Sequence, residues 1–334
     1  MLRVVFMGTP ELAAAVLRRL VRSPSLDVVL VVTQPDRPQG RRRQLAPPPV
    51  KQVAAELGLP IIQPVRLRRP EGVARVAAAR PDLFAVVAYG EILSPELLAL
   101  PRLAPVNLHA SLLPAYRGAA PIAWAILAGE EVTGMTTMWI DAGMDSGDIL
   151  EQTSTPVRAG ETAGELEARL TPLGAELLVH TLETFSVLGT KVPRRAQDPD
   201  GISYAPKLRK EYGWLDWAKP VDRLAREVRA YNPWPGSYTR YVEAGAARQL
   251  KVHRARALQP AAADALPPVP RLPGEVVRAD AGGLWVGAGG QRLLALEEVQ
   301  PESRRAMTAA EFLRGHAIAV GSLLGEAGLS TGRG

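Results

Sequence analysis

The sequence contains no cysteine among its 334 residues. Disulfide bonds and thiolate-bound metal sites are therefore excluded, and a reducing compartment fits the composition best. The histidines at positions 180, 253 and 316 do not fall at metal-ligand spacings either, so we expect no metal.

Long hydrophobic runs are also absent. The longest apolar stretches, such as residues 28–32 and 83–88, have the length of a strand and are far too short to cross a bilayer. The N-terminus runs straight into a buried-strand pattern and lacks the hydrophobic region of a signal peptide. We therefore expect a cytoplasmic protein with no membrane partner.

The length of the chain exceeds what one ordinary hydrophobic core holds, so we expect two domains. In the first half, short β-branched runs alternate with helical patterns, which is typical of a doubly wound, mostly parallel, Rossmann-like α/β sheet. Gly8 follows the first strand, but no Gly-x-Gly-x-x-Gly motif is present, so a dinucleotide site is not expected. The predicted strands are residues 3–7, 28–33, 83–88, 106–109 and 136–140, and the predicted helices are residues 11–21, 50–57, 95–100 and 119–128.

The second half has a helical pattern at residues 219–231, followed by short alternating segments separated by Gly/Pro turns. Such a succession predicts a smaller, OB-like β-barrel domain. Its predicted strands are residues 237–241, 249–255, 274–278, 283–286 and 292–298. We predict a catalytic domain over residues 1–190, a linker over 191–206, a barrel over 207–320 and a tail over 321–334.

Positive charge is concentrated in the barrel domain. Lys+Arg and Asp+Glu are 21 each up to residue 206, but 19 against 13 from residue 207 onward, so this part carries the whole net charge of +6. A basic appendage on a neutral body suggests a polyanionic partner, with nucleic acid the first candidate. The alternative is an ordinary solvated surface in an arginine-rich chain.

Residues 34–49 contain five prolines and four arginines. We expect them to form a long structureless loop, and such loops in compact domains are usually functional or disordered. Arginines on a mobile loop near a site suit phosphates and unpaired bases.

The densest chemical signal is the segment Asn-Leu-His-Ala-Ser-Leu-Leu-Pro at residues 107–114. Asn107 and His109 are two residues apart at a predicted strand end, so their side chains can point the same way. An amide donor beside an imidazole suits the attack of an amine on a carbonyl, because the imidazole moves protons and the amide holds the developing oxyanion. The alternative is a hydrogen-bonded histidine near a sheet end.

A second polar segment follows the strand at residues 136–140 and contains Asp141, Asp145 and Asp148 with two glycines. A carboxylate from this loop could reach and orient His109. The alternative is an Asp/Gly-rich turn.

These segments resemble a known family. Asn-x-His-x-Ser-Leu-Leu-Pro, followed by Arg-Gly-Ala-Ala-Pro at residues 117–121, is similar to the signature of the folate-dependent formyltransferases. The resemblance implies a catalytic trio of Asn107, His109 and Asp145, with 10-formyltetrahydrofolate as the formyl donor. It also implies folate contacts from a second set of residues: Ser111, Leu112, Leu113, Pro114, Tyr89 and Gly90. The Leu113–Pro114 bond is a candidate for a cis peptide.

Further segments, at residues 7–13, 34–41, 87–90 and 232–235, resemble the branch of the family that formylates methionyl initiator tRNA. In that branch an inserted basic loop contacts the acceptor end of the tRNA, which assigns this role to Arg37, Arg41, Arg42 and Arg43. The basic barrel adds tRNA contacts that we expect from Arg209, Lys210, Arg254 and Arg256. We expect a monomer. A sugar-nucleotide formyltransferase, which would lack the loop, and a non-catalytic RNA-binding protein are the alternatives.

Overall fold

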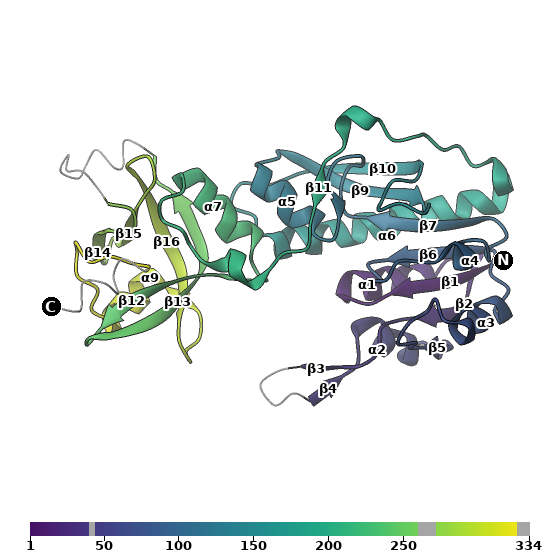
Figure 1. The fold of residues 1–334 in the computed structure, drawn as a ribbon, viewed down its shortest axis with the longest axis horizontal. Coiled ribbons are helices and arrows are strands. Elements are labelled where there is room, and N and C mark those ends of the chain that lie inside the picture. The colour runs from purple at the N-terminus through teal and green to yellow at the C-terminus, as the bar shows by residue number, and fades with distance from the viewer. Residues whose placement is uncertain (40–43, 260–271, 326–334) are drawn as a thin grey trace. The chain divides into compact units, whose positions relative to one another are not determined.

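The computed structural model describes residues 1–39, 44–259 and 272–325, which divide into two compact units (Figure 1). The first unit contains Met1–Pro121, Val132–Pro156 and Glu167–Pro206. The second contains Ile122–Glu131, Val157–Leu166 and the described residues from Lys207 onward. The domain boundaries that the sequence suggests, at residues 190, 206 and 320, stay a prediction.

A seven-stranded sheet forms the centre of the first unit, in the order β10-β9-β7-β6-β1-β2-β5. The five strands from β7 to β5 are parallel, whereas β9 is antiparallel to β7 and β10 is antiparallel to β9. The mostly parallel α/β sheet that the sequence predicts is therefore confirmed. The strands are β1 (Leu2–Gly8), β2 (Leu26–Val32), β5 (Ile61–Ile62), β6 (Leu83–Val87), β7 (Ala104–His109), β9 (Val132–Trp139) and β10 (Ile149–Pro156).

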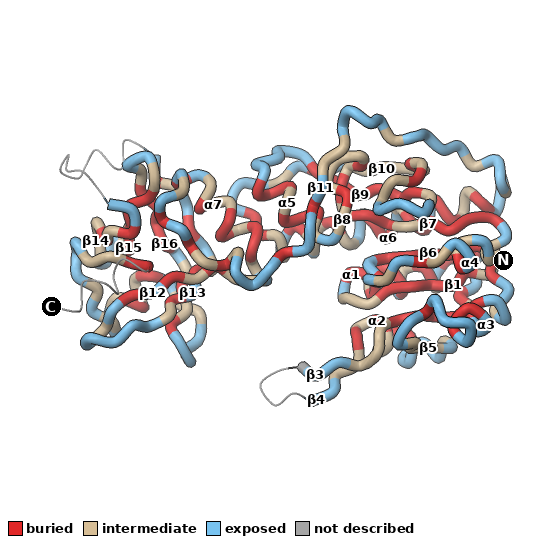
Figure 2. The backbone as a smooth tube through the Cα atoms, in the orientation of Figure 1, coloured by how far each residue is buried: buried red, intermediate tan, exposed pale blue. Residues whose placement is uncertain are grey.

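The central strands are hydrophobic along their whole length because both faces of the sheet are covered. All five residues of β6 are buried, and Figure 2 shows the same for most of β1. From β1 the chain moves outward to β2 and β5, then returns to the other side of β1 with β6 and β7. This reversal is a topological switch point, where ligands of open α/β sheets bind beyond the carboxyl ends of the strands.

Six helices are described up to residue 188, of which α5 from Ile122 onward and the start of α6 belong to the second unit. The sequence did not predict two of these helices, α3 and α6, nor the strands β5 and β10. The helices are α1 (Glu11–Leu20), α2 (Pro49–Glu56), α3 (Pro70–Ala78), α4 (Pro95–Leu98), α5 (Pro121–Ala128) and α6 (Ala163–Leu188). None of the helices in the described part of the chain is long and apolar enough to cross a membrane.

The described residues of the proline- and arginine-rich stretch include two strands and the start of a helix, so the prediction of a structureless loop over residues 34–49 is wrong. Strands β3 (Arg37–Gln39) and β4 (Gln44–Ala46) pair as an antiparallel hairpin, and α2 begins at Pro49. Pro38 is tolerated because a two-stranded ribbon has two edges, and proline needs no partner for its nitrogen on a free edge.

The second unit contains a curled antiparallel half-barrel in the order β12-β13-β16-β15-β14, with β17 paired to β16. This confirms the small β-rich domain that the alternating segments predict. Two helices, α7 (Val221–Ala230) and α9 (Ala309–Gly315), belong to the same unit. The strands are β12 (Ser237–Glu243), β13 (Ala246–Ala257), β14 (Val276–Asp280), β15 (Gly283–Ala288), β16 (Arg292–Pro301) and β17 (Met307–Thr308).

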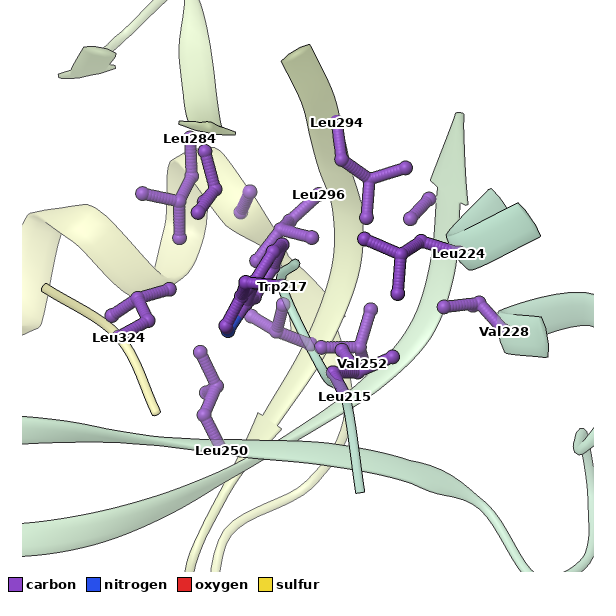
Figure 3. Close-up of a cluster of buried hydrophobic side chains, with 14 of the residues drawn as sticks. Leu215, Trp217, Leu224, Val228, Leu250, Val252, Leu284, Leu294, Leu296 and Leu324 are labelled. Carbon is purple, nitrogen blue, oxygen red and sulfur yellow. The ribbon is translucent and has the colours of Figure 1, made fainter. Parts of the chain in front are cut away.

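Trp217 lies in the core of the half-barrel, among the leucine and valine side chains drawn in Figure 3. Its indole N–H donates to Thr239 Oγ1 at 3.1 Å, which satisfies the one polar group of this buried ring. Leu324 joins the same core. Residues 321–325 also hydrogen-bond to both edges of the sheet, because Gly321 N donates to Val276 O in β14 and Gly325 N donates to Arg240 O in β12.

Candidate active site

Strand β7 brings Asn107 and His109 to the carboxyl edge of the sheet, between β6 and β9. His109 is buried, with 6% of its side chain exposed, and Asn107 is partly exposed. Within the described structure the Asn107 amide makes no hydrogen bond, so both of its N–H groups can donate to a ligand.

The His109 ring is held by the main chain of the following loop. Its Nε2 lies 2.9 Å from the carbonyl oxygen of Tyr116. Because a carbonyl can only accept, Nε2 carries the proton, and in the neutral ring Nδ1 is the nitrogen that can take up another. The Tyr116 carbonyl therefore selects the tautomer of the His109 ring.

Asp145 supplies the carboxylate on the other side of the ring. Its Oδ2 lies 3.7 Å from His109 Nδ1 and accepts a 2.8 Å hydrogen bond from Gly118 N. The separation from Nδ1 is that of an ion pair rather than of a hydrogen bond. The carboxylate is thus placed to stabilise the imidazolium that forms when Nδ1 takes a proton.

The other two aspartates of the loop have different partners. Asp141 accepts hydrogen bonds from Ser146 Oγ and Gly143 N, which close the turn on itself. Asp148 lies 3.7 Å from the guanidinium of Arg194. Of the three carboxylates, only that of Asp145 faces the imidazole.

The turn at residues 111–114 is locked by Thr136 of β9, which the sequence analysis did not identify. Thr136 Oγ1 donates to Ser111 O at 2.6 Å and accepts from Leu113 N at 3.1 Å. Gln152 donates to the carbonyl of Leu113 at 2.9 Å, and the Leu113–Pro114 bond is cis. The side chains of Ser111 and Leu113 are buried, whereas Leu112 and Pro114 are partly exposed and can contact a ligand.

Tyr89 and Gly90 follow the end of β6 and contribute main chain rather than side chain. The Tyr89 ring is packed in the hydrophobic core of the unit, and burial raises the pKa of its hydroxyl. Its carbonyl oxygen accepts from Thr9 Oγ1 and from Gln34 Nε2. Gly90 has a φ of 87°, and a Cβ there would lie 2.6 Å from Gln34 Nε2.

Only one of the four arginines predicted for the basic loop can be located. Arg37 is exposed on β3 and donates to Gln34 Oε1 at 2.5 Å. Arg41, Arg42 and Arg43 lie outside the described residues.

In the second unit the predicted tRNA-binding cations differ in their partners. Arg209 and Lys210 are exposed and make no ion pair within the described residues. Arg254 is paired with Glu165 and lies 3.6 Å from Glu298, and Arg256 lies 2.8 Å from Glu297. Arg254 and Arg256 would have to give up their carboxylate partners in order to bind phosphates. Arg209 and Lys210 have no such partners among the described residues to give up and are therefore the stronger candidates for phosphate binding.

An amide donor, an imidazole and a carboxylate at the carboxyl edge of a doubly wound sheet are the parts of a group-transfer enzyme that acts on a carbonyl carbon. Residues 2–182 match the family Formyl transferase, and residues 207–317 match Formyl transferase, C-terminal domain. The chain therefore belongs to the formyl transferase family, and the expectation of an enzyme is confirmed.

Curated relatives extend this similarity over nearly the full chain. A methionyl-tRNA formyltransferase of Thiobacillus denitrificans is 47% identical over 97% of this chain and 100% of its own length. One from Geobacter sulfurreducens is 43% identical over 98% of both chains. The solved structure of WlaRD, a sugar 3N-formyl transferase, shares the fold with a TM-score of 0.61 and 15% identity, covering 91% of this chain and 99% of its own.

Proposed function

We propose that the protein transfers the formyl group of 10-formyltetrahydrofolate to the α-amino group of methionyl initiator tRNA, giving N-formylmethionyl-tRNA. The observation that carries this proposal is the 43–47% identity, over nearly the full length, to proteins curated as methionyl-tRNA formyltransferases. The placement of His109 between a carbonyl and a carboxylate supplies the chemistry that such a transfer needs.

In the proposed reaction the methionyl amine attacks the formyl carbon and forms a new C–N bond. The carbonyl oxygen becomes an oxyanion, to which the free Asn107 amide donates. His109 Nδ1 takes the proton that the attacking nitrogen loses, and Asp145 stabilises the resulting imidazolium. The bond between the formyl carbon and N10 then breaks, and the proton passes to N10, so that tetrahydrofolate leaves in neutral form at this nitrogen.

The folate donor is supported by the family and by the structural relative WlaRD, which was solved in the presence of 5-N-formyl-THF. In this proposal Leu112 and Pro114 contact the folate through their side chains, while the buried Ser111 and Leu113 stabilise the conformation of the turn. Tyr89 and Gly90 offer their main chain to the same ligand.

The tRNA is proposed to contact the hairpin of β3 and β4 and the basic residues of the second unit. An arginine-rich hairpin, which follows β2 in the chain, suits the phosphates and unpaired bases of an acceptor end. The absence of a metal requirement, the cytoplasmic location and the monomeric state remain predictions.

Formylation assays with competing acceptors test the proposal. The protein, given 10-formyltetrahydrofolate, should convert methionyl initiator tRNA to formylmethionyl-tRNA and leave dTDP-linked aminosugars unchanged. Replacing Arg41, Arg42 and Arg43 by alanine should weaken use of the tRNA and flatten its salt dependence, while transfer to a small amine surrogate survives. Formylation of the sugar in preference to the tRNA would overturn the proposal.

A further inference from the structure

Residues 183–206 lie between the two stretches that match the family, yet they contact the candidate active site. Strand β11 (Tyr204–Ala205) pairs in parallel with β8 (Arg117–Gly118). One residue earlier, Ser203 Oγ accepts the N–H of Tyr116 at 2.9 Å. Tyr116 is the residue whose carbonyl holds the His109 ring, so this intervening segment supports one side of the imidazole.

Gln197 of the same segment binds the loop that carries Asp145, on the other side of the imidazole. Its Nε2 donates to the carbonyl oxygens of Asp145 and Gly147, both at 2.8 Å. Its Oε1 accepts from Nε and Nη2 of Arg117, at 3.0 and 2.7 Å. Because a guanidinium has only donors and a carbonyl only accepts, the amide can satisfy all four contacts in one orientation alone.

Asp145 needs such support because its backbone is left-handed. Its φ is 50°, a conformation that costs a non-glycine residue about 1–2 kcal/mol. The residue is held in it from two directions, by Gln197 at the main-chain carbonyl and by Gly118 N at the carboxylate. Gly118 directly follows Arg117 in the chain, and Gln197 binds the Arg117 guanidinium. Both hydrogen bonds that fix Asp145 therefore depend on the position of the buried Arg117.

We propose that Gln197 is a positioning residue for catalysis, which keeps the Asp145 carboxylate facing His109 by fixing the backbone of its loop. This inference rests on the proposed function and extends it to a residue outside both family matches. Gln197 touches neither reacting group of the substrates in this account, and acts only through Asp145.

The substitution Gln197→Glu separates positioning from folding. The new carboxylate still accepts from Arg117, but it presents an oxygen to the two loop carbonyls and can no longer donate to them. We expect kcat for formyl transfer to fall about 10- to 100-fold, as for other displacements of about 1 Å in a catalytic group, with KM for the tRNA within twofold. Gln197→Met, which removes both functions of the amide, should lose at least as much.

Asp200→Asn is the matched control. It exchanges a carboxylate and an amide in the same segment, at an exposed residue whose side chain bonds to no other described residue. Its kcat should stay within twofold of the wild-type value, and all three variants should retain cooperative thermal unfolding.

A double-mutant cycle with Asp145 distinguishes a positioning role of Gln197 from a merely structural one. If Gln197 acts through Asp145, then Gln197→Glu should change single-turnover rates less than twofold when Asp145 is already alanine. Multiplicative losses, or a wild-type kcat for Gln197→Glu, would overturn the inference while formylation by the wild-type protein stands. A wild-type protein that forms no formylmethionyl-tRNA would overturn the proposed function, and this inference with it.

Discussion

Replacing Asp145 by asparagine should lower kcat about 30- to 150-fold. The side chain keeps its shape and can still accept from Gly118 N, so the main loss is the negative charge beside His109. At the observed 3.7 Å, two unit charges attract by about 1 kcal/mol in water and about 4–5 kcal/mol at an effective dielectric constant of about 20. The imidazole is buried and the carboxylate partly so, which places the energy at about 2–3 kcal/mol, and each 1.36 kcal/mol changes the rate tenfold.

The loss should appear in kcat because the imidazolium exists only while a proton is in transit. The assay is formylation of methionyl initiator tRNA with both substrates saturating. Asp141→Asn makes the same exchange in the same loop, at a carboxylate that binds only within its own turn, and should cost less than threefold. A turnover for Asp145→Asn above half of the wild-type value, or an equal loss in both variants, would refute the electrostatic role.

Three further substitutions test other parts of the structure. Gly90→Ala should destabilise the first unit by about 1–3 kcal/mol in urea unfolding, because its φ is 87° and the new Cβ would meet Gln34 Nε2; an unchanged midpoint would contradict this. Leu324→Ala should cost the second unit about 2–5 kcal/mol, since this side chain is buried in the half-barrel core, and a loss below about 1 kcal/mol would show that residues 321–325 are dispensable. Glu151 raises the pKa of His180, so their attraction stabilises the fold fully below a pH of about 6.5 and is lost as the pH rises through the raised pKa. Glu151→Gln should move the NMR titration of His180 down toward that value, and identical titrations would contradict the pairing.

The sequence predicted the parallel strands well because buried strands appear in a sequence as short, continuous hydrophobic runs. The β-branched and aliphatic runs at residues 3–7 and 83–88 correspond to β1 and β6. The long helix α6 has a weaker helical pattern in the sequence, because it contains Pro172 and two glycines. Gly174 has a reason to be there, because a Cβ at this position would lie 2.6 Å from Met135 of β9.

The sequence predicted which residues form the candidate site, but not the hydrogen bonds that orient them. Asn107, His109 and Asp145 stand in a recognisable pattern, and the structure places the last two 3.7 Å apart. The contacts that orient them come from a main-chain carbonyl at Tyr116 and from Gln197, which is 52 residues beyond Asp145. A carbonyl has no signature in a sequence, and a contact at that separation depends on the path of the folded chain.

The proposed formyl transfer depends on an amide and an imidazole acting together on one formyl carbon. Single-turnover transfer from 10-formyltetrahydrofolate to methionyl initiator tRNA tests it most directly, with Asn107→Ala and His109→Ala compared with the wild-type protein. We expect the rate to fall by about 10²–10³ when the oxyanion donor Asn107 is replaced and by about 10²–10⁴ when the proton-transfer residue His109 is replaced, with the Kd for tRNA within twofold. A wild-type rate in either variant would contradict it.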